Sequence, residues 1–227
     1  MALPPVLHPS LFMSPVPARR VVAVAASTGG PSALTHLLSR LPAELPAGVI
    51  VVQHMPAGGF TRALAERLDG VCALKVREAQ HGDPVALGQV LIAPAGCHLR
   101  VSRLRGAGVV LLDRGPAVNN HRPSADVLFE SVARAFGARA VGVVLTGMGE
   151  DGAEGLHALR QAGGRTLAQD EQSSVVFGMP RAAVRRGAVD RVLPLEELAR
   201  AVVTEADRAE AHYRWHHALQ GANSQRM

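Results

Sequence analysis

Ser27, His54 and Asp151 each follow a run of apolar residues, in the segments AASTGG, VVQHMP and LTGMGEDGA. A serine hydroxyl, an imidazole and a carboxylate are three groups that together can attack an acyl carbon. The imidazole removes the proton of the hydroxyl, and the carboxylate fixes the tautomer of the imidazole and stabilises its charged form. These residue types predict nucleophilic acyl chemistry, provided that the fold brings the three positions together.

Each candidate also has a purely structural interpretation. Ser27 lies in the pattern A-x-S-x-G, a relaxed form of the strand-to-helix turn that exposes a nucleophilic serine, and the helix after it offers N–H groups to a developing oxyanion. Ser27 could equally cap that helix, as serines commonly do. His54 could be a buried histidine packed at a strand end, and His121, in the segment NNHRPS, is the best rival for the role of base.

The segment around Asp151 also matches a different motif. Gly147, Gly149 and Gly152 form G-x-G-x-x-G, and Asp170 stands where a ribose-binding acid is expected after a dinucleotide fingerprint. However, a pyrophosphate at this turn would face two carboxylates, those of Glu150 and Asp151, each repelling it by about 1 kcal/mol. A phosphate loop presents N–H groups and little negative charge. We therefore favour a role for Asp151 beside His54, or as a helix cap, over a dinucleotide site.

Apolar runs alternate with helical patterns along the chain. Strands are predicted at 20–26, 48–54, 72–78, 88–94, 140–147, 164–170 and 189–195, with a hairpin at 98–113. Helices are predicted at 30–41, 60–68, 123–137, 151–162, 180–186 and 195–219. This alternation predicts an α/β fold with a doubly wound, mostly parallel sheet, helices on both faces and an inserted β-hairpin. In such a sheet, functional groups gather at the carboxyl ends of the strands, which is where Ser27, His54 and Asp151 stand.

The domain organisation follows from the same pass along the chain. We expect a flexible, proline-rich lead-in over 1–18, a single catalytic domain over 19–203, and a C-terminal helix extension with a tail over 204–227.

Composition restricts the classes of function. The net charge is +5, but the arginines are spread out and aromatic residues make up only 3 %, so nucleic-acid binding is not expected. No run approaches the ~18 apolar residues of a membrane span, and the N-terminus is not of the signal-peptide type. The two cysteines form no CxxC pair, which argues against a metal site. We expect a cytoplasmic protein with no metal, no other cofactor and no membrane insertion.

Five segments of the sequence together resemble one family. They are AASTGGPSAL, VVQHMPAGGFT, NNHRPSADVLF, VVLTGMGEDGA and SSVVFGMPRAA, and they occur in the family's order between about residues 20 and 200. The family they resemble is the catalytic domain of the bacterial chemotaxis protein-glutamate methylesterases, of the CheB type.

The resemblance implies a serine hydrolase that removes methyl groups from glutamate γ-methyl esters of chemoreceptors and also deamidates receptor glutamines. It implies Ser27 as nucleophile, His54 as base and Asp151 as acid, with Thr28 and Met148 lining the site. As a separate hypothesis, the Met148 N–H is the oxyanion donor. The expected partners are the cytoplasmic helices of methyl-accepting chemotaxis receptors, with a separate response regulator as a further candidate.

Three departures from the family pattern stand out. Ala25 replaces the first glycine of the usual GASTGG, and the loop MPAGGFT is one residue longer than usual. Family members often carry an N-terminal phospho-receiver domain of about 120 residues, whereas only 19 residues precede the first predicted strand here. Regulation by a receiver in the same chain is therefore not expected. The alternative function is a methylesterase-like domain that acts on another signalling protein, or as a scaffold, outside chemotaxis.

Overall fold

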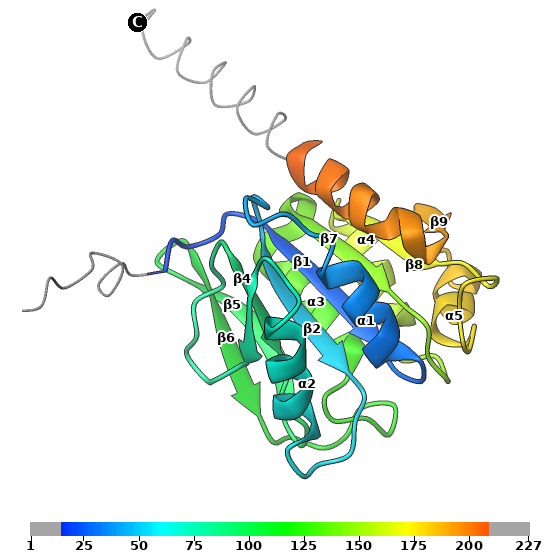
Figure 1. Cartoon of the computed structure of the whole chain (residues 1–227), viewed down its shortest axis with the longest axis horizontal. Helices are drawn as coiled ribbons and strands as arrows, with labels where there is room; N and C mark the ends of the chain where they lie inside the picture. Colours follow the sequence, from blue (N-terminus) through cyan, green and yellow to red (C-terminus); the bar gives the residue numbers. More distant parts are fainter. Residues whose placement is uncertain (1–14, 209–227) are drawn as a thin grey trace, which may run out of the picture.

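A seven-stranded sheet forms the centre of the molecule in the computed structural model, which describes residues 15–208 (Figure 1). Its order is β3-β4-β2-β1-β7-β8-β9, and every pair of neighbouring strands is parallel. The strands are β1 (Val21–Ala26), β2 (Gly48–Gln53), β3 (Lys75–Glu78), β4 (Gln89–Ile92), β7 (Ala140–Val144), β8 (Arg165–Gln169) and β9 (Arg191–Leu193). The order reverses between β1 and β7, which makes the carboxyl ends of these two strands the switch point at which such folds bind ligands.

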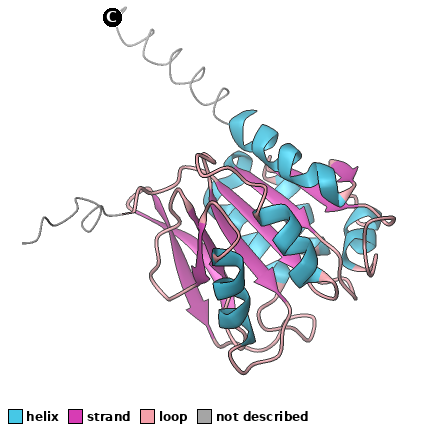
Figure 2. Cartoon of the chain, in the orientation of Figure 1, coloured by secondary structure: helices cyan, strands magenta, loops and turns pink. Residues whose placement is uncertain are grey.

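Both faces of the sheet are buried. In β1, Val22 and Val24 pack into one apolar cluster, whereas Val21 and Ala23 pack into the other. This explains why the strands read as continuous apolar runs rather than as alternating patterns. Helices lie on both sides of the sheet (Figure 2), and their apolar side chains supply the outer halves of both clusters. The first face carries α1 (Gly30–Leu38), α2 (Phe60–Asp69) and a helical segment over 195–208, and the second carries α3 (Ala125–Phe136), α4 (Ala153–Gln161) and α5 (Met179–Arg185).

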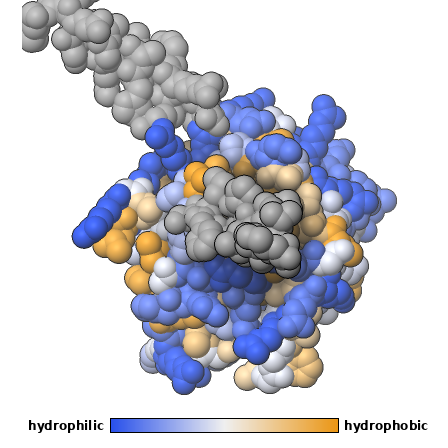
Figure 3. Space-filling model, turned by 60° about the vertical axis from the view of Figure 1, so that its left-hand side comes forward, coloured by the Kyte–Doolittle hydropathy of each residue, from blue (hydrophilic) through white to orange (hydrophobic). Residues whose placement is uncertain are grey.

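A separate antiparallel hairpin lies beside α3. It consists of β5 (His98–Leu104) and β6 (Ala107–Asp113), joined at Arg105 and Gly106, whose φ angles are 50° and 87°. Positive φ at both central residues is the geometry of a tight hairpin turn. The Val101 N–H donates to Ser131 Oγ of α3 over 2.9 Å, which fixes the hairpin to the helix. The molecular face turned forward in Figure 3 is largely hydrophilic, with separate hydrophobic patches.

The predicted fold class is confirmed: the doubly wound parallel sheet, the helices on both faces and the inserted hairpin are all present. Differences are confined to the ends of elements. The helix expected from residue 151 begins at Ala153, because Gly152 forms its left-handed N-cap with φ 97°. The last helix is seen over 195–208, and the remainder of the expected 195–219 lies outside the described residues.

Residues 16–18, at the end of the expected lead-in, are attached to the folded body. The Ala18 N–H donates to the Val85 carbonyl over 2.8 Å, and Ala18 is buried. Val16 accepts from the Leu87 N–H over 2.9 Å. Residues 1–14 of that lead-in lie outside the described residues, as does the tail from 209 onward. Within residues 15–208, the structure contains no helix with the length and apolar character needed to cross a membrane.

Candidate active site

The register of β1 and β2 brings Ser27 next to His54. Ala26 pairs with Gln53 as the last rung of the ladder, and the His54 N–H donates to the Ala26 carbonyl over 3.0 Å. On its other side, the Ser27 N–H donates to the Thr146 carbonyl, beyond the end of β7, over 3.0 Å. Ser27 therefore lies between the ends of β2 and β7, at the switch point of the sheet.

Gln53 fixes the backbone at this point. Its Nε2 donates to the carbonyls of Ser27 and His54, over 2.9 and 3.0 Å. The Gly30 N–H also donates to the Ser27 carbonyl, over 2.8 Å. A Cβ on Gly30 would lie 1.9 Å from Gln53 Oε1, so the start of α1 can approach Gln53 this closely only with glycine at position 30. The backbone that carries Ser27 is thus held from both sides of the turn.

Asp151 lies against the imidazole of His54. The distance from His54 Nε2 to Asp151 Oδ2 is 2.8 Å, and the two side chains are 6 % and 0 % exposed. Because an ionised carboxylate can only accept a hydrogen bond, the neutral form of His54 carries its proton on Nε2 and keeps a lone pair on Nδ1. Nδ1 is buried and has no hydrogen-bond partner, so the Ser27 hydroxyl is not bonded to it in this conformation. His54 Nδ1 is therefore a buried ring nitrogen whose hydrogen-bonding capacity is not used by another residue that the structure describes.

The Asp151 carboxylate is bound at the N-terminus of α3, not by its own helix. It accepts hydrogen bonds from Ser124 Oγ (2.7 Å), the Ala125 N–H (2.6 Å) and Asn119 Nδ2 (3.0 Å). The positive end of the α3 dipole favours a negative charge at this place. Burial acts to raise the pKa of Asp151, but the hydrogen bonds from His54, Ser124, Ala125 and Asn119 outweigh it and hold the pKa at about 2. The carboxylate is therefore ionised at neutral pH.

This low pKa predicts a specific loss of stability in acid. The pKa of Asp151 lies below the ordinary aspartate value of about 3.9 in the unfolded chain. Its ionised form therefore stabilises the fold above about pH 4, and this contribution is lost as the pH falls through about 2. We expect the free energy of unfolding to lose about 2 to 3 kcal/mol from this group. Urea unfolding between pH 5 and 2 measures it, with the Asp151→Asn protein as reference. Equal pH dependence in both proteins would contradict the expectation.

A second buried carboxyl group adjoins Asp151. Asn119 Nδ2 also donates to Asp126 Oδ2 over 2.6 Å, and the Gly155 N–H donates to Asp126 Oδ1 over 2.7 Å. Burial raises the pKa of Asp126, as does the nearby charge of Asp151, against the hydrogen bond from Gly155. The Asn119 amide thus bridges two carboxyl groups and ties the loop before α3 to the turn before α4.

Thr28 and Met148, the residues expected to line the site, lie on the loops that flank Ser27. Thr28 is exposed, and its carbonyl accepts from Thr146 Oγ1 over 2.9 Å. The Met148 side chain is 70 % exposed and follows Gly147, on which a Cβ would lie 2.8 Å from Ser27 Cβ. The turn can approach Ser27 this closely because residue 147 is glycine.

The contacts of Ser27, Asp170 and Asp151 bear on the two alternatives, a helix-capping serine and a dinucleotide site. The N-cap of α1 is Gly29, with no side-chain cap, so the Ser27 hydroxyl does not cap that helix. Asp170 is engaged in its own turn, where its Oδ1 accepts from the N–H and hydroxyl of Ser173. Glu150 is exposed, and Asp151 points toward α3 instead of toward the helix that the glycines precede. These contacts do not favour a dinucleotide site at the glycine-rich turn.

Comparison with known proteins identifies the family. The model of the CheB methylesterase family matches residues 22–202. The chain belongs to this family. It is 55 % identical over 184 residues to the protein-glutamate methylesterase/protein-glutamine glutaminase of Symbiobacterium thermophilum, covering 81 % of this chain and 50 % of that protein. It is 53 % identical over 186 residues to a protein of the same name, numbered 2, from Xanthomonas campestris, covering 82 % of this chain and 52 % of that protein.

A solved structure is similar over nearly its whole length. The CheB methylesterase catalytic domain of Thermotoga maritima superimposes with a TM-score of 0.80 at 38 % sequence identity, covering 82 % of this chain and 97 % of that one. By contrast, the chain spans about half the length of the curated relatives it matches.

Ala25, which departs from the CheB pattern, fits into β1 without disturbing the sheet. Ala25 pairs with Val52 on one side and Val144 on the other, and it is fully buried. Its methyl group packs into the apolar cluster beneath the sheet, within an unbroken ladder.

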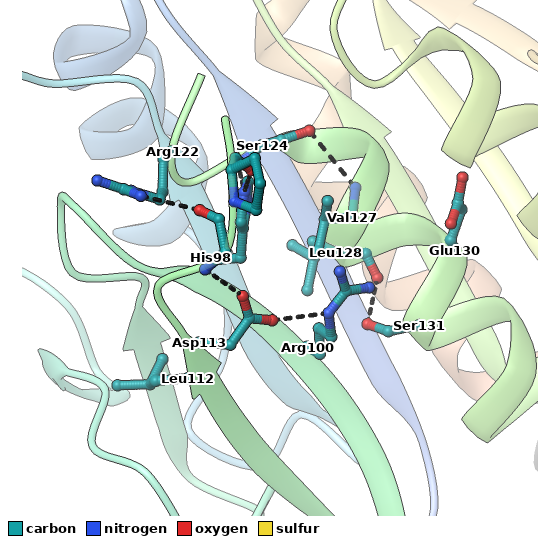
Figure 4. A network of polar contacts seen from close by, with 12 residues as sticks. His98, Arg100, Leu112, Asp113, Arg122, Ser124, Val127, Leu128, Glu130 and Ser131 are labelled. Carbon is teal, nitrogen blue, oxygen red and sulfur yellow. Dashed lines mark hydrogen bonds and ion pairs between the residues drawn. The ribbon is translucent and has the colours of Figure 1, made fainter. Parts of the chain in front are cut away.

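The sequence did not reveal several residues that position the CheB-type site. Ser124 is the N-cap of α3, a common role for serine, but its hydroxyl also donates to Asp151. The signal for Asn119 was its place in the segment NNHRPS, which resembles the family without showing what it contacts. His98 was one of many histidines, yet its Nε2 donates to the Pro116 carbonyl over 2.8 Å. Its Nδ1 accepts from the Ser124 N–H over 3.3 Å, and both residues belong to the polar network drawn in Figure 4.

Proposed function

We propose that the protein is a serine esterase that hydrolyses γ-methyl esters of protein glutamate residues. The observation that carries the proposal is the 2.8 Å contact between His54 and Asp151, next to Ser27 at the switch point of the sheet. A charged, buried carboxylate fixes the imidazole so that its free nitrogen can act as base. Membership of the CheB methylesterase family supports the choice of ester, since the relatives' names specify protein glutamate and protein glutamine.

The mechanism follows from the protonation states of the three side chains. His54 Nδ1 takes the proton of the Ser27 hydroxyl as Ser27 Oγ attacks the γ-carbonyl carbon of the ester. Asp151 stabilises the imidazolium that forms, because its carboxylate is already ionised and held by α3. The imidazolium then protonates the departing methoxide, which leaves as methanol. Water, deprotonated by His54, hydrolyses the acyl-enzyme and releases a glutamate side chain with the Ser27 hydroxyl restored.

The same acyl-enzyme forms from a glutamine side chain. Attack of Ser27 on the amide carbonyl expels ammonia in place of methanol, and hydrolysis again yields glutamate. The oxyanion that develops in both reactions needs N–H donors, for which the Met148 amide is our candidate because its turn lies against Ser27. Deamidation of glutamine is thus the expected second activity of one site.

For the substrate we propose chemoreceptors, at the glutamate-rich helices of their cytoplasmic part. A net charge of +5 favours approach to segments rich in glutamate. The site contains no residue whose role requires a metal or an organic cofactor, and the described residues include no group of histidine, cysteine, aspartate and glutamate side chains that could hold a metal ion.

The test is release of volatile methanol from a receptor fragment that carries tritiated γ-methyl esters. The purified chain is expected to release methanol and to leave glutamate, measured by mass spectrometry of receptor peptides. In parallel, glutamine at the same receptor positions should gain the mass of glutamate. A chain that is fully folded yet releases no methanol from any methylated receptor, while hydrolysing small esters, would contradict the proposed substrate.

A further inference from the structure

One face of the His54 ring is covered by a second imidazole. The rings of His54 and His121 lie 3.8 Å apart between centroids, with 4° between their planes. The edge of the His54 ring is engaged at the same time, since Nε2 is bound to Asp151. His121 therefore does not take the place of His54 beside the carboxylate, as a rival base would. It packs on the residue that holds that place.

A tight turn delivers His121 to this position. Val118 and His121 exchange two backbone hydrogen bonds, of 2.9 and 3.1 Å, around Asn119 and Asn120. The two asparagines have φ angles of 52° and 62°, the left-handed geometry that a turn of this kind requires and that asparagine tolerates. The side chain of Asn119 binds Asp151 from the same turn. One four-residue turn thus contacts both the carboxylate and the imidazole.

We propose that His121 is a positioning residue, whose ring holds the His54 imidazole in the plane that directs one nitrogen at Asp151 and the other at Ser27. This inference rests on the proposed function, in which His54 is the base. The stacked ring of His121 resists tilting and rotation of the His54 ring. Either movement would misalign the His54 nitrogens with Asp151 and Ser27. The His121 ring also keeps water from that face of the His54 ring during proton transfer.

The stacked ring further suits the charge that His54 acquires. Burial is the main cause that lowers the pKa of His121; a positive charge on His54 lowers this pKa further, and the charge of Asp151 acts in the opposite direction. A lowered pKa favours the neutral form of His121, which presents a π face to the imidazolium of His54. A cation over an aromatic face at a desolvated site is stabilised by an amount equivalent to about a 10-fold change in rate.

The test compares three variants of position 121 in the methanol assay. His121→Phe keeps a flat ring without a titrating group, and we expect kcat within about 3-fold of wild type with an unchanged pH profile. His121→Ala and His121→Leu remove the stack, and we expect kcat to fall about 10-fold with little change in KM. The leucine variant retains side-chain volume and serves if the alanine variant is poorly folded. His36→Ala, on α1, is the matched control and should remain at wild-type activity.

Two outcomes would overturn the inference. Equal activity in all three variants would show that the stack has no effect, and loss of all activity in the phenylalanine variant would show that His121 itself transfers protons. Failure of the proposed function is distinguishable, because it would leave the wild type without methanol release. The inference would still be tested by nitrogen NMR of the His54 ring. The proton on Nε2 should exchange slowly in wild type and His121→Phe but rapidly in His121→Ala, and equal exchange in all would contradict the positioning role.

Discussion

Ser27→Ala is expected to reduce kcat for methanol release by about 10⁴-fold or more, since loss of the nucleophile of a triad has effects of this size. The fold should be unaffected, because Ser27 is held through its backbone. Its N–H binds Thr146, and its carbonyl accepts from Gly30 and from the side chain of Gln53. Methanol release from tritiated receptor measures the loss, and thermal unfolding should show a melting temperature close to that of wild type.

Ser32→Ala is the matched control for this variant. Ser32 is an exposed serine in α1, a few residues from Ser27, and its hydroxyl has no part in the proposed reaction. The control should retain full activity. If Ser27→Ala retained more than about a tenth of wild-type kcat, far above the residual rate of a triad without its nucleophile, Ser27 would not be the nucleophile.

The second large effect is expected for Asp151→Asn, with a fall in kcat of about 10⁴-fold. An amide can present its NH₂ to His54, which reverses the tautomer and removes the lone pair from the nitrogen that faces Ser27. The amide is neutral, so it also fails to stabilise the imidazolium. The amide also offers fewer acceptor sites to the Ala125 N–H and the Ser124 hydroxyl than the carboxylate does. The free energy of unfolding should therefore fall by about 1 to 3 kcal/mol.

Kinetics and urea unfolding at pH 7 measure these two effects separately. Glu150→Gln is the control, because Glu150 precedes Asp151 on the same turn but is exposed. It removes an equal charge from the same loop and should alter neither kcat nor stability appreciably. An Asp151→Asn protein that remains folded and retains activity within about 10-fold of wild type would exclude Asp151 as the residue that orients the base.

The fold was largely predictable because the central strands of the sheet are buried on both faces. That burial requires continuous apolar runs, such as residues 48–53, and the helices between them repeat with a helical period. The ends of elements were less predictable. Asp151 looked like the first residue of a helix, but its carboxylate binds the N-terminus of α3 across the site, and the following residue, Gly152, is the N-cap of α4. Which residue caps which helix therefore depends on tertiary contacts, and the local sequence pattern does not reveal it.

The residues of the candidate site were likewise predictable only in part. Ser27 and His54 could be placed next to each other from the sequence, because they follow strands whose carboxyl ends share one edge of the sheet. Asn119 and His121 could not be assigned, because they act from a loop whose path depends on the turn at 118–121 and on its packing against α3. A histidine in a loop is compatible with catalysis, stacking or exposure, and only the packed structure distinguishes between them.

The central claim, that Asp151 acts through His54 on Ser27, is tested most directly by one comparison of rates. Methanol release would be measured for Ser27→Ala, for Asp151→Asn and for the variant with both changes. If the residues form one catalytic unit, the double variant should be no slower than Ser27→Ala alone, because the carboxylate has no function without the nucleophile. A double variant slower than Ser27→Ala by the full factor that Asp151→Asn causes in the wild-type background would show that the two residues act independently, and would contradict the account.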